Sequence, residues 1–319
     1  MNNFKKIGLT ALAGSLVATT SAFAGSMSVA GSASINLEHT NGGAANTGKT
    51  FSMGNQLTFS GSGELDNGMN VSLSFIIDQN DDSTTAGAAY SGGPFDSHSV
   101  TVSSDALGTI KLSGEGGSSS TTAIDTSAAG DLWDNYDAED GLEPNGVGDS
   151  DNMFMYTMPT LMDGISINAS YEPTGSGTNS ATGFGVTYTG IEGLSVSYAS
   201  GDDSTVAAAD ATVLKGSYAY GPVTIAYSDY EYDTAATTND DDMTAYKVTY
   251  TVSDELSVAY ASEDIDTGTK SADYNEVSVA YTTGGMTISA SMGEANNRDG
   301  TTTATMDNER WALGASFAF

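Results

Sequence analysis

The sequence contains no cysteine, and only 9 basic residues stand against 41 acidic ones, for a formal net charge of −32 over 319 residues. The absence of cysteine excludes disulfides, thiolate chemistry and cysteine-based zinc sites. A nucleic-acid partner is not expected, because so few basic residues are available to neutralise phosphate groups. Charged residues make up 16% of the chain, below the roughly one quarter of typical globular domains. An ordered structure built largely from small residues is therefore expected.

Long hydrophobic runs are also missing, apart from a short apolar stretch near the N-terminus. Two lysines precede apolar residues 7–17, and residues 22–24 (Ala-Phe-Ala) match the small-x-small pattern of a signal-peptidase site. The stretch is too short for a transmembrane helix, which needs about 20 apolar residues. We expect a cleaved secretory signal peptide over residues 1–24, a mature β-barrel over residues 25–319, and no membrane-spanning helix.

The remaining chain has apolar residues at every second position, which predicts β-strands. We count 16 such segments, joined by seven short turns and eight longer connections rich in Asp, Asn, Thr and Gly. The longer connections are residues 39–49, 78–96, 115–152, 172–182, 201–212, 231–242, 263–272 and 294–307. Short turns at one end and long loops at the other are typical of an all-β, antiparallel, up-and-down transmembrane barrel, with both termini at the short-turn end.

The direction of the apolar face is not set by alternation alone, because a soluble β-sandwich alternates in the same way. The non-apolar positions are mostly Ser, Thr, Asn, Gly and Ala, which suit a wet lumen. The apolar positions of the regular strands are expected to carry no charge, as contact with lipid requires. Tyrosines at the strand ends predict two aromatic girdles; they are Tyr171, Tyr198, Tyr227, Tyr260, Tyr188, Tyr220, Tyr250 and Tyr281.

Four segments resemble those of the Gram-negative general porins, which are 16-stranded and usually trimeric. They are Leu65-Asp-Asn-Gly-Met69, Leu107-Gly-Thr-Ile-Lys-Leu112, Met155-Tyr-Thr-Met-Pro-Thr-Leu-Met-Asp-Gly-Ile165 and the C-terminal strand ending in Phe319. The resemblance implies a water-filled channel in the outer membrane for passive diffusion of small hydrophilic solutes and ions. It also implies a homotrimer, and recognition of the terminal Phe319 strand by the barrel assembly machinery.

The third long loop, residues 115–152, is the longest of the eight and the main candidate site. Porins fold this loop into the barrel, and here an apolar cluster around Trp133 could anchor it. The loop contains no Lys or Arg, and its candidate constriction acids are Asp125, Asp131, Asp134, Asp137, Glu139, Asp140 and Glu143. Such a constriction would favour cations. The alternative is a solvated surface loop, common for acidic segments rich in Gly and Ser.

Porins usually place basic residues on the barrel wall opposite the acidic loop. By strand alternation, four bases point into the lumen: Lys111, Lys215, Lys247 and Arg310. They could face the acidic loop across the pore, or they could be solvated charges remote from it. The small number of bases leads us to expect preference for cations rather than anions.

Other functional classes receive little support from the sequence. Asp-rich stretches such as residues 239–242 lack the ligand order of an EF-hand loop, and no cofactor or metal site is expected. No catalytic motif is present, so an enzyme is not expected. Two alternatives stay open: a substrate-selective porin of the same fold, and a secreted, acidic, β-rich adhesin or surface-layer protein.

Overall fold

A computed structural model describes residues 25–42, 48–78, 96–136, 147–148, 151–173, 180–203, 209–234, 240–268, 270–298 and 307–319. The expected signal peptide, residues 1–24, lies outside the described residues. No helix in these ranges is long and apolar enough to cross a membrane. The helix of the third long loop is η2 (Leu132–Tyr136). The strands are β1 (Ser26–Gly42), β2 (Gly48–Glu64), β3 (Asn70–Asp78), β4 (Ser97–Ser104), β5 (Gly108–Glu115), β6 (Met153–Thr157), β7 (Ile165–Pro173), β8 (Ser180–Tyr188), β9 (Leu194–Asp203), β10 (Ala209–Tyr220), β11 (Val223–Asp233), β12 (Asp241–Thr251), β13 (Leu256–Thr267), β14 (Lys270–Thr283), β15 (Met286–Asn296) and β16 (Asn308–Ala318).

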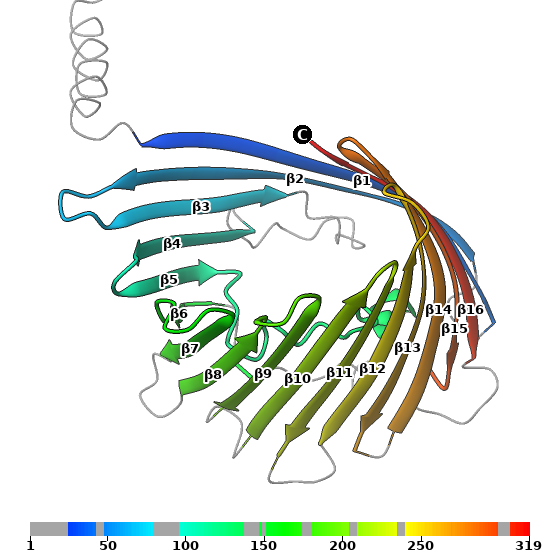
Figure 1. The fold of residues 1–319 in the computed structure, drawn as a ribbon. Coiled ribbons are helices and arrows are strands. Elements are labelled where there is room, and N and C mark those ends of the chain that lie inside the picture. The colour runs from blue at the N-terminus through cyan, green and yellow to red at the C-terminus, as the bar shows by residue number, and fades with distance from the viewer. Residues whose placement is uncertain are drawn as a thin grey trace, which may run out of the picture.

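These strands form a closed antiparallel barrel in which each strand pairs with its neighbours in the chain and β16 pairs with β1 (Figure 1). At the seam, the backbone N–H of Gly31 donates to the carbonyl of Phe319 at 2.7 Å, and the Phe319 N–H donates to the Gly31 carbonyl at 2.9 Å. Closure pairs the first strand with the last, as a barrel surrounded by hydrocarbon requires. The predicted 16-stranded fold is confirmed.

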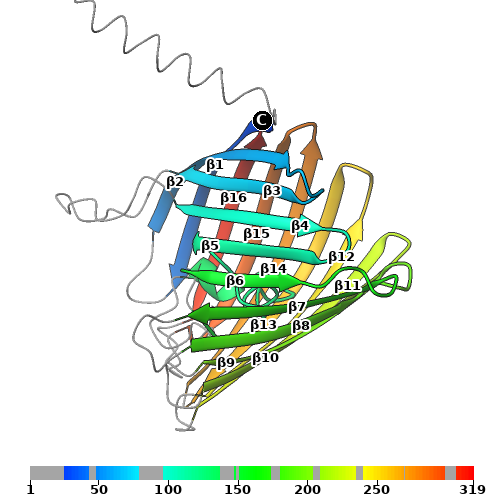
Figure 2. The same cartoon turned by 90° about the vertical axis from the view of Figure 1, so that its left-hand side faces the viewer.

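The apolar positions face outward around the barrel, and their chain neighbours face inward. On β10, for example, Leu214 is 43% exposed, whereas Val213 is fully buried inside. The strands are tilted, and the wall is shortest at β3–β6 (Figure 2). All eight tyrosines predicted to form girdles have exposed rings. The outer surface is therefore an apolar band bordered by aromatic rings, suited to contact with lipid.

The expectation that outward positions carry no charge is wrong beyond the tyrosine rows. Hydrogen bonding between strands continues past those rows, so that β13, for example, ends at Thr267, within the connection expected over residues 263–272. Alternation then places one base, Lys49, and a set of acids on the outer face. The acids are Asp202, Asp210, Asp229, Glu231, Asp233, Asp242, Asp264, Asp266, Asp273, Glu294 and Glu309. The alternating apolar residues end at the edge of the lipid-facing band, whereas the strands continue past that edge toward the long loops.

Candidate pore constriction

The chain after β5 enters the barrel and crosses its interior, as predicted for the third long loop. The backbone N–H of Ser120 donates to Ser170 Oγ on β7 at 2.9 Å, and that of Ala128 donates to Ser228 Oγ on β11 at 2.7 Å. Further along, η2 packs against β13 and β14 (Figure 1). Contacts with inward-facing side chains from β7 to β14 place residues 117–136 inside the lumen and exclude a loop lying free in solvent.

Small residues on the inner wall make room for the loop. At Gly201 a Cβ atom would lie 2.9 Å from Val147 Cγ1 and 3.3 Å from Thr121 Cγ2, both in the third long loop. Nearby inward alanines are buried; they are Ala181, Ala199, Ala209, Ala211, Ala245, Ala261, Ala272 and Ala295. The wet lumen expected from the Ser, Thr, Gly and Ala face is therefore only part of the interior, because the loop packs against the buried side chains on this side.

Glu263 on β13 is the main polar anchor of the loop. Its carboxylate is completely buried and accepts hydrogen bonds from Ser127 Oγ and from the backbone N–H of Trp133, the latter at 2.9 Å. Ser127 Oγ in turn accepts the backbone N–H of Asp131 at 2.9 Å. Buried carboxylates are costly unless their hydrogen bonds are satisfied, so this network holds the loop in one position. Sequence reasoning missed Glu263, although it is a lone acid between inward-facing Ala261 and Ile265.

Two of the four predicted wall bases bind the loop backbone. Lys215 Nζ donates to the Thr126 carbonyl at 2.6 Å, and Lys247 Nζ donates to the Ala129 carbonyl at 3.4 Å. A further base, Arg298, is buried and donates from Nη1 to the Tyr136 carbonyl at 3.0 Å. The loop is therefore held by cations along its length, a role that strand alternation alone does not indicate.

The other two predicted wall bases make no hydrogen bond to a described residue of the loop, although Arg310 lies close enough to Tyr136 of η2 to act on it electrostatically. Arg310 is paired with Glu38 on β1 at 2.7 Å and with Glu276 on β14 at 3.7 Å. Lys111 on β5 is exposed and makes no hydrogen bond or ion pair with any described residue. The four bases thus do not form one cluster, and Lys111 is the one among them without a partner in the described parts of the chain.

Three of the predicted constriction acids are described, and they differ in their surroundings. Asp134 in η2 is exposed to the lumen. Burial and the nearby Asp131 raise the pKa of Asp125 to about 6, and Lys215 opposes that shift. The pKa of Asp131 is also raised, mainly by burial. The remaining predicted acids, Asp137, Glu139, Asp140 and Glu143, lie outside the described residues.

A closed, lipid-facing barrel with a loop fixed across its lumen is the architecture of an outer-membrane diffusion pore. A family model for Gram-negative porins matches residues 8–319, and the chain belongs to that family. It is therefore a channel of the bacterial outer membrane for passive diffusion, and porins are channels rather than enzymes. Family and fold both favour a porin over the secreted adhesin considered from the sequence.

Solved porin structures have the same fold. An anion-selective porin from Comamonas acidovorans is 17% identical, with a TM-score of 0.70, covering 92% of this chain and 100% of that one. A loop-deletion mutant of the Vibrio cholerae outer-membrane protein OmpT is 17% identical, with a TM-score of 0.67 over 93% and 100% of the two chains. A triple mutant of Rhodopseudomonas blastica porin is 14% identical, with a TM-score of 0.66 over 92% and 100%. No curated protein matches by sequence.

Proposed function

We propose that this porin conducts cations in preference to anions, through a constriction formed by the acidic third long loop. The proposal rests on the contacts made by the inward-facing bases of the barrel wall. Lys215 and Lys247 are bound to loop carbonyls, and Arg310 is paired with two glutamates. The two glutamates thus offset the charge of Arg310, and Asp125 and Asp131 lie near Lys215 and oppose its charge. Lys247 and the exposed Lys111 keep their positive charge, and Asp134 is exposed in the lumen. Fixed negative charge at a narrow point raises the local concentration of cations.

The size of the effect can be estimated from Coulomb's law. Two unit charges about 8 Å apart in water interact by about 0.5 kcal/mol, which is roughly a twofold change in ion occupancy per fixed charge. Neutralising Asp125, Asp131 and Asp134 together should therefore lower the cation-to-anion permeability ratio several-fold.

The test is the reversal potential of single channels in a planar bilayer under a KCl gradient. The wild-type protein should show a potential of the sign that indicates cation preference, and the variant Asp125→Asn/Asp131→Asn/Asp134→Asn should move toward zero. Asp229→Asn/Asp264→Asn/Asp266→Asn, which removes three outward charges, is the matched control and should behave like the wild type. A potential favouring anions in the wild-type protein would contradict the proposal.

We further propose that the protein assembles as a homotrimer and that the terminal strand ending in Phe319 is the signal read by the barrel assembly machinery. The terminal residue supports the second point, because its ring is 75% exposed while its backbone closes the seam with Gly31. Phe319→Ala should lower the yield of folded barrel in the outer membrane, measured by heat-modifiable gel migration. Refolding of the purified variant in detergent micelles should be retained.

A further inference from the structure

The last residue of η2, Tyr136, fills a gap in the inner wall. Gly293 on β15 faces the lumen, and a Cβ atom there would lie 2.6 Å from Tyr136 Oη and 3.4 Å from the Cα atom of Glu276. The ring of Tyr136 is buried, and its centroid lies 5.7 Å from that of Tyr274 on β14. Because Gly293 has no side chain, the end of η2 can reach the wall at this point.

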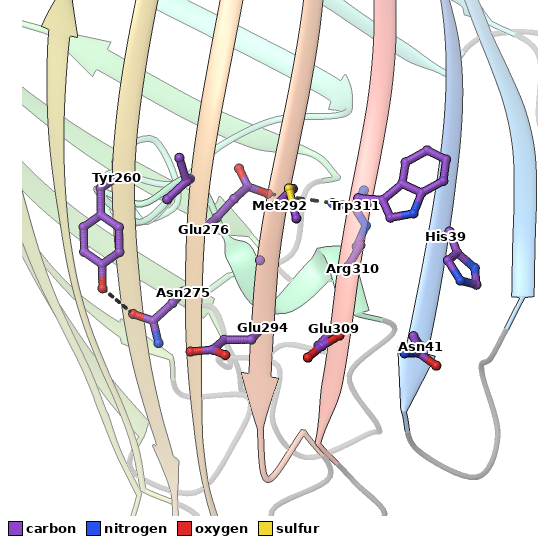
Figure 3. Close-up of a pocket in the computed structure, with 12 residues that line it drawn as sticks. His39, Asn41, Tyr260, Asn275, Glu276, Met292, Glu294, Glu309, Arg310 and Trp311 are labelled. Carbon is purple, nitrogen blue, oxygen red and sulfur yellow. Dashed lines mark hydrogen bonds and ion pairs between the residues drawn. The ribbon is translucent and has the colours of Figure 1, made fainter.

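Two charged side chains border this gap. Strand pairing places Arg310 on one side of Gly293 and Glu276 on the other. Arg310 Nη1 lies 3.7 Å from Glu276 Oε2, and Figure 3 marks this contact with a dashed line. The two side chains are 8% and 17% exposed. The hydroxyl of Tyr136 therefore lies beside a largely buried ion pair, and both charges act on it electrostatically.

The same guanidinium group crosses the seam at which the barrel closes. Arg310 lies on β16 and donates from Nε and Nη2 to Glu38 Oε2 on β1, at 3.1 and 2.7 Å. The other carboxylate oxygen, Glu38 Oε1, accepts a hydrogen bond from Thr50 Oγ1 on β2 at 2.9 Å. These side-chain contacts join β14, β16, β1 and β2. Arg310 is therefore shared between the seam and the part of the wall that meets the loop.

The polar groups around the gap are incompletely paired within the described structure. Tyr136 Oη is buried and has no hydrogen-bond partner there. The Glu276 carboxylate has its ion pair with Arg310 but no hydrogen bond with a described residue. Buried polar groups cost free energy unless they are paired. One water molecule between Tyr136 Oη, Glu276 and Arg310 would have three polar partners, the number typical of a buried water.

We propose that Arg310 is a positioning residue of the constriction, which joins the third long loop to the seam of the barrel. Its guanidinium group is held by Glu38 and Glu276, and the Tyr136 hydroxyl binds the Arg310–Glu276 pair through one water molecule. The end of η2 and the closed seam thus stabilise each other. This coupling goes beyond the proposed cation preference, because it concerns the position of the loop and not its charge.

Hydrogen exchange of the purified channel in detergent tests the coupling at the amides of residues 133–136. Glu38→Gln weakens the hold on Arg310 from β1, although Glu38 makes no hydrogen bond or ion pair with a described loop residue. Exchange should accelerate about tenfold, the factor that one hydrogen bond to a charged group is worth. Glu309→Gln changes an outward acid next to Arg310 in the chain; it is the matched control and should exchange like the wild type. Unchanged exchange in Glu38→Gln would overturn the proposal.

A double-mutant cycle separates this coupling from a general loosening of the barrel. Tyr136→Phe keeps the ring and removes only the hydroxyl, whereas Arg310→Lys keeps the charge but loses the planar group that holds two carboxylates. Each variant should exchange about tenfold faster than the wild type. The double variant should also be about tenfold faster, because both changes remove one shared contact. Independent effects, which multiply to about a hundredfold, would overturn the proposal.

Single-channel recordings in a planar bilayer give the functional readout. Arg310→Lys and Tyr136→Phe should both show larger current fluctuations in the open state, because the end of η2 is less restricted. Their reversal potentials in a KCl gradient should match the wild type, since neither change alters the charge of the lumen. Wild-type fluctuations in both variants would overturn the proposal, and that result does not depend on whether the wild type prefers cations.

Discussion

At the scale of single residues, Glu263 decides whether the constriction loop keeps one position. Its buried carboxylate accepts hydrogen bonds from Ser127 Oγ and the Trp133 N–H. Glu263→Gln would replace one acceptor oxygen by an NH2 group that faces a donor, and each lost hydrogen bond to a charged group costs about 1.5–3 kcal/mol. We expect hydrogen exchange at the Trp133 amide to accelerate by roughly 10- to 100-fold.

The matched control for this change is Asp264→Asn on the same strand. Asp264 points outward, so the loop should exchange as in the wild type. Single-channel recordings should agree with the exchange data: Glu263→Gln should give larger and noisier conductance, whereas the control should not. Unchanged protection at Trp133 in Glu263→Gln would show that apolar packing alone positions the loop.

At the scale of elements, the loop and the wall fit together because the wall offers small side chains. Gly201→Leu would place a side chain where Val147 and Thr121 now pack, and overpacking of this kind typically costs about 1–3 kcal/mol. We expect the loop to be displaced, with altered single-channel conductance and a barrel that still resists detergent. Gly216→Leu on β10 is the control, because a Cβ there would meet nothing closer than 3.8 Å and would point to lipid.

The strands and the loop differ in how far the sequence predicts them. Lipid on one side and the lumen on the other impose a two-residue period, so the strands follow from the apolar residues. Their order and facing follow once the lengths of the connections, the polar face and the tyrosine rows are added. Strand ends such as Thr267 lie beyond the predicted ends, because above the lipid band the outward positions no longer need to be apolar. The part of the wall that the loop contacts could not be predicted from the sequence. An inward Ala or Gly is compatible both with contact with water and with contact with a loop residue such as Leu132. Likewise, alternation places Lys215 and Lys247 in the lumen, but it cannot show that they bind the loop backbone.

At the scale of the whole molecule, the acidic residues on the described strands and on the described part of the third long loop lie on two sides of the wall, with separate consequences. Outward acids such as Glu294 and Glu309 stand above the lipid-facing band. Inward acids such as Asp134 are exposed inside the barrel, where we propose that ions pass. Because screening lengths are about 3 Å at 1 M salt and about 10 Å at 0.1 M, selectivity that comes from inward charge should weaken steeply with salt. Reversal potentials at a fixed concentration ratio, recorded at about 0.1 M and about 1 M KCl, would check this.

Cation preference should also depend on pH in the mildly acidic range. The pKa of Asp125 is raised to about 6 by burial and by Asp131, while Lys215 opposes the shift and Tyr230 lies close by. A raised carboxyl pKa means that the negative charge is present above about pH 6 and is lost below it. Ordinary surface carboxyls titrate near pH 4, but the pKa of the outward Asp264 is also raised to about 6, so the variant described below is needed to assign a selectivity step near pH 6 to Asp125. We expect the cation-to-anion permeability ratio to fall about fourfold for each charge lost between pH 7 and pH 5, because cation occupancy falls and anion occupancy rises by about twofold each. In Asp125→Asn/Asp131→Asn the ratio should be lower at pH 7 and should change little down to pH 5, and a step of wild-type size in that variant would assign the titration to other groups.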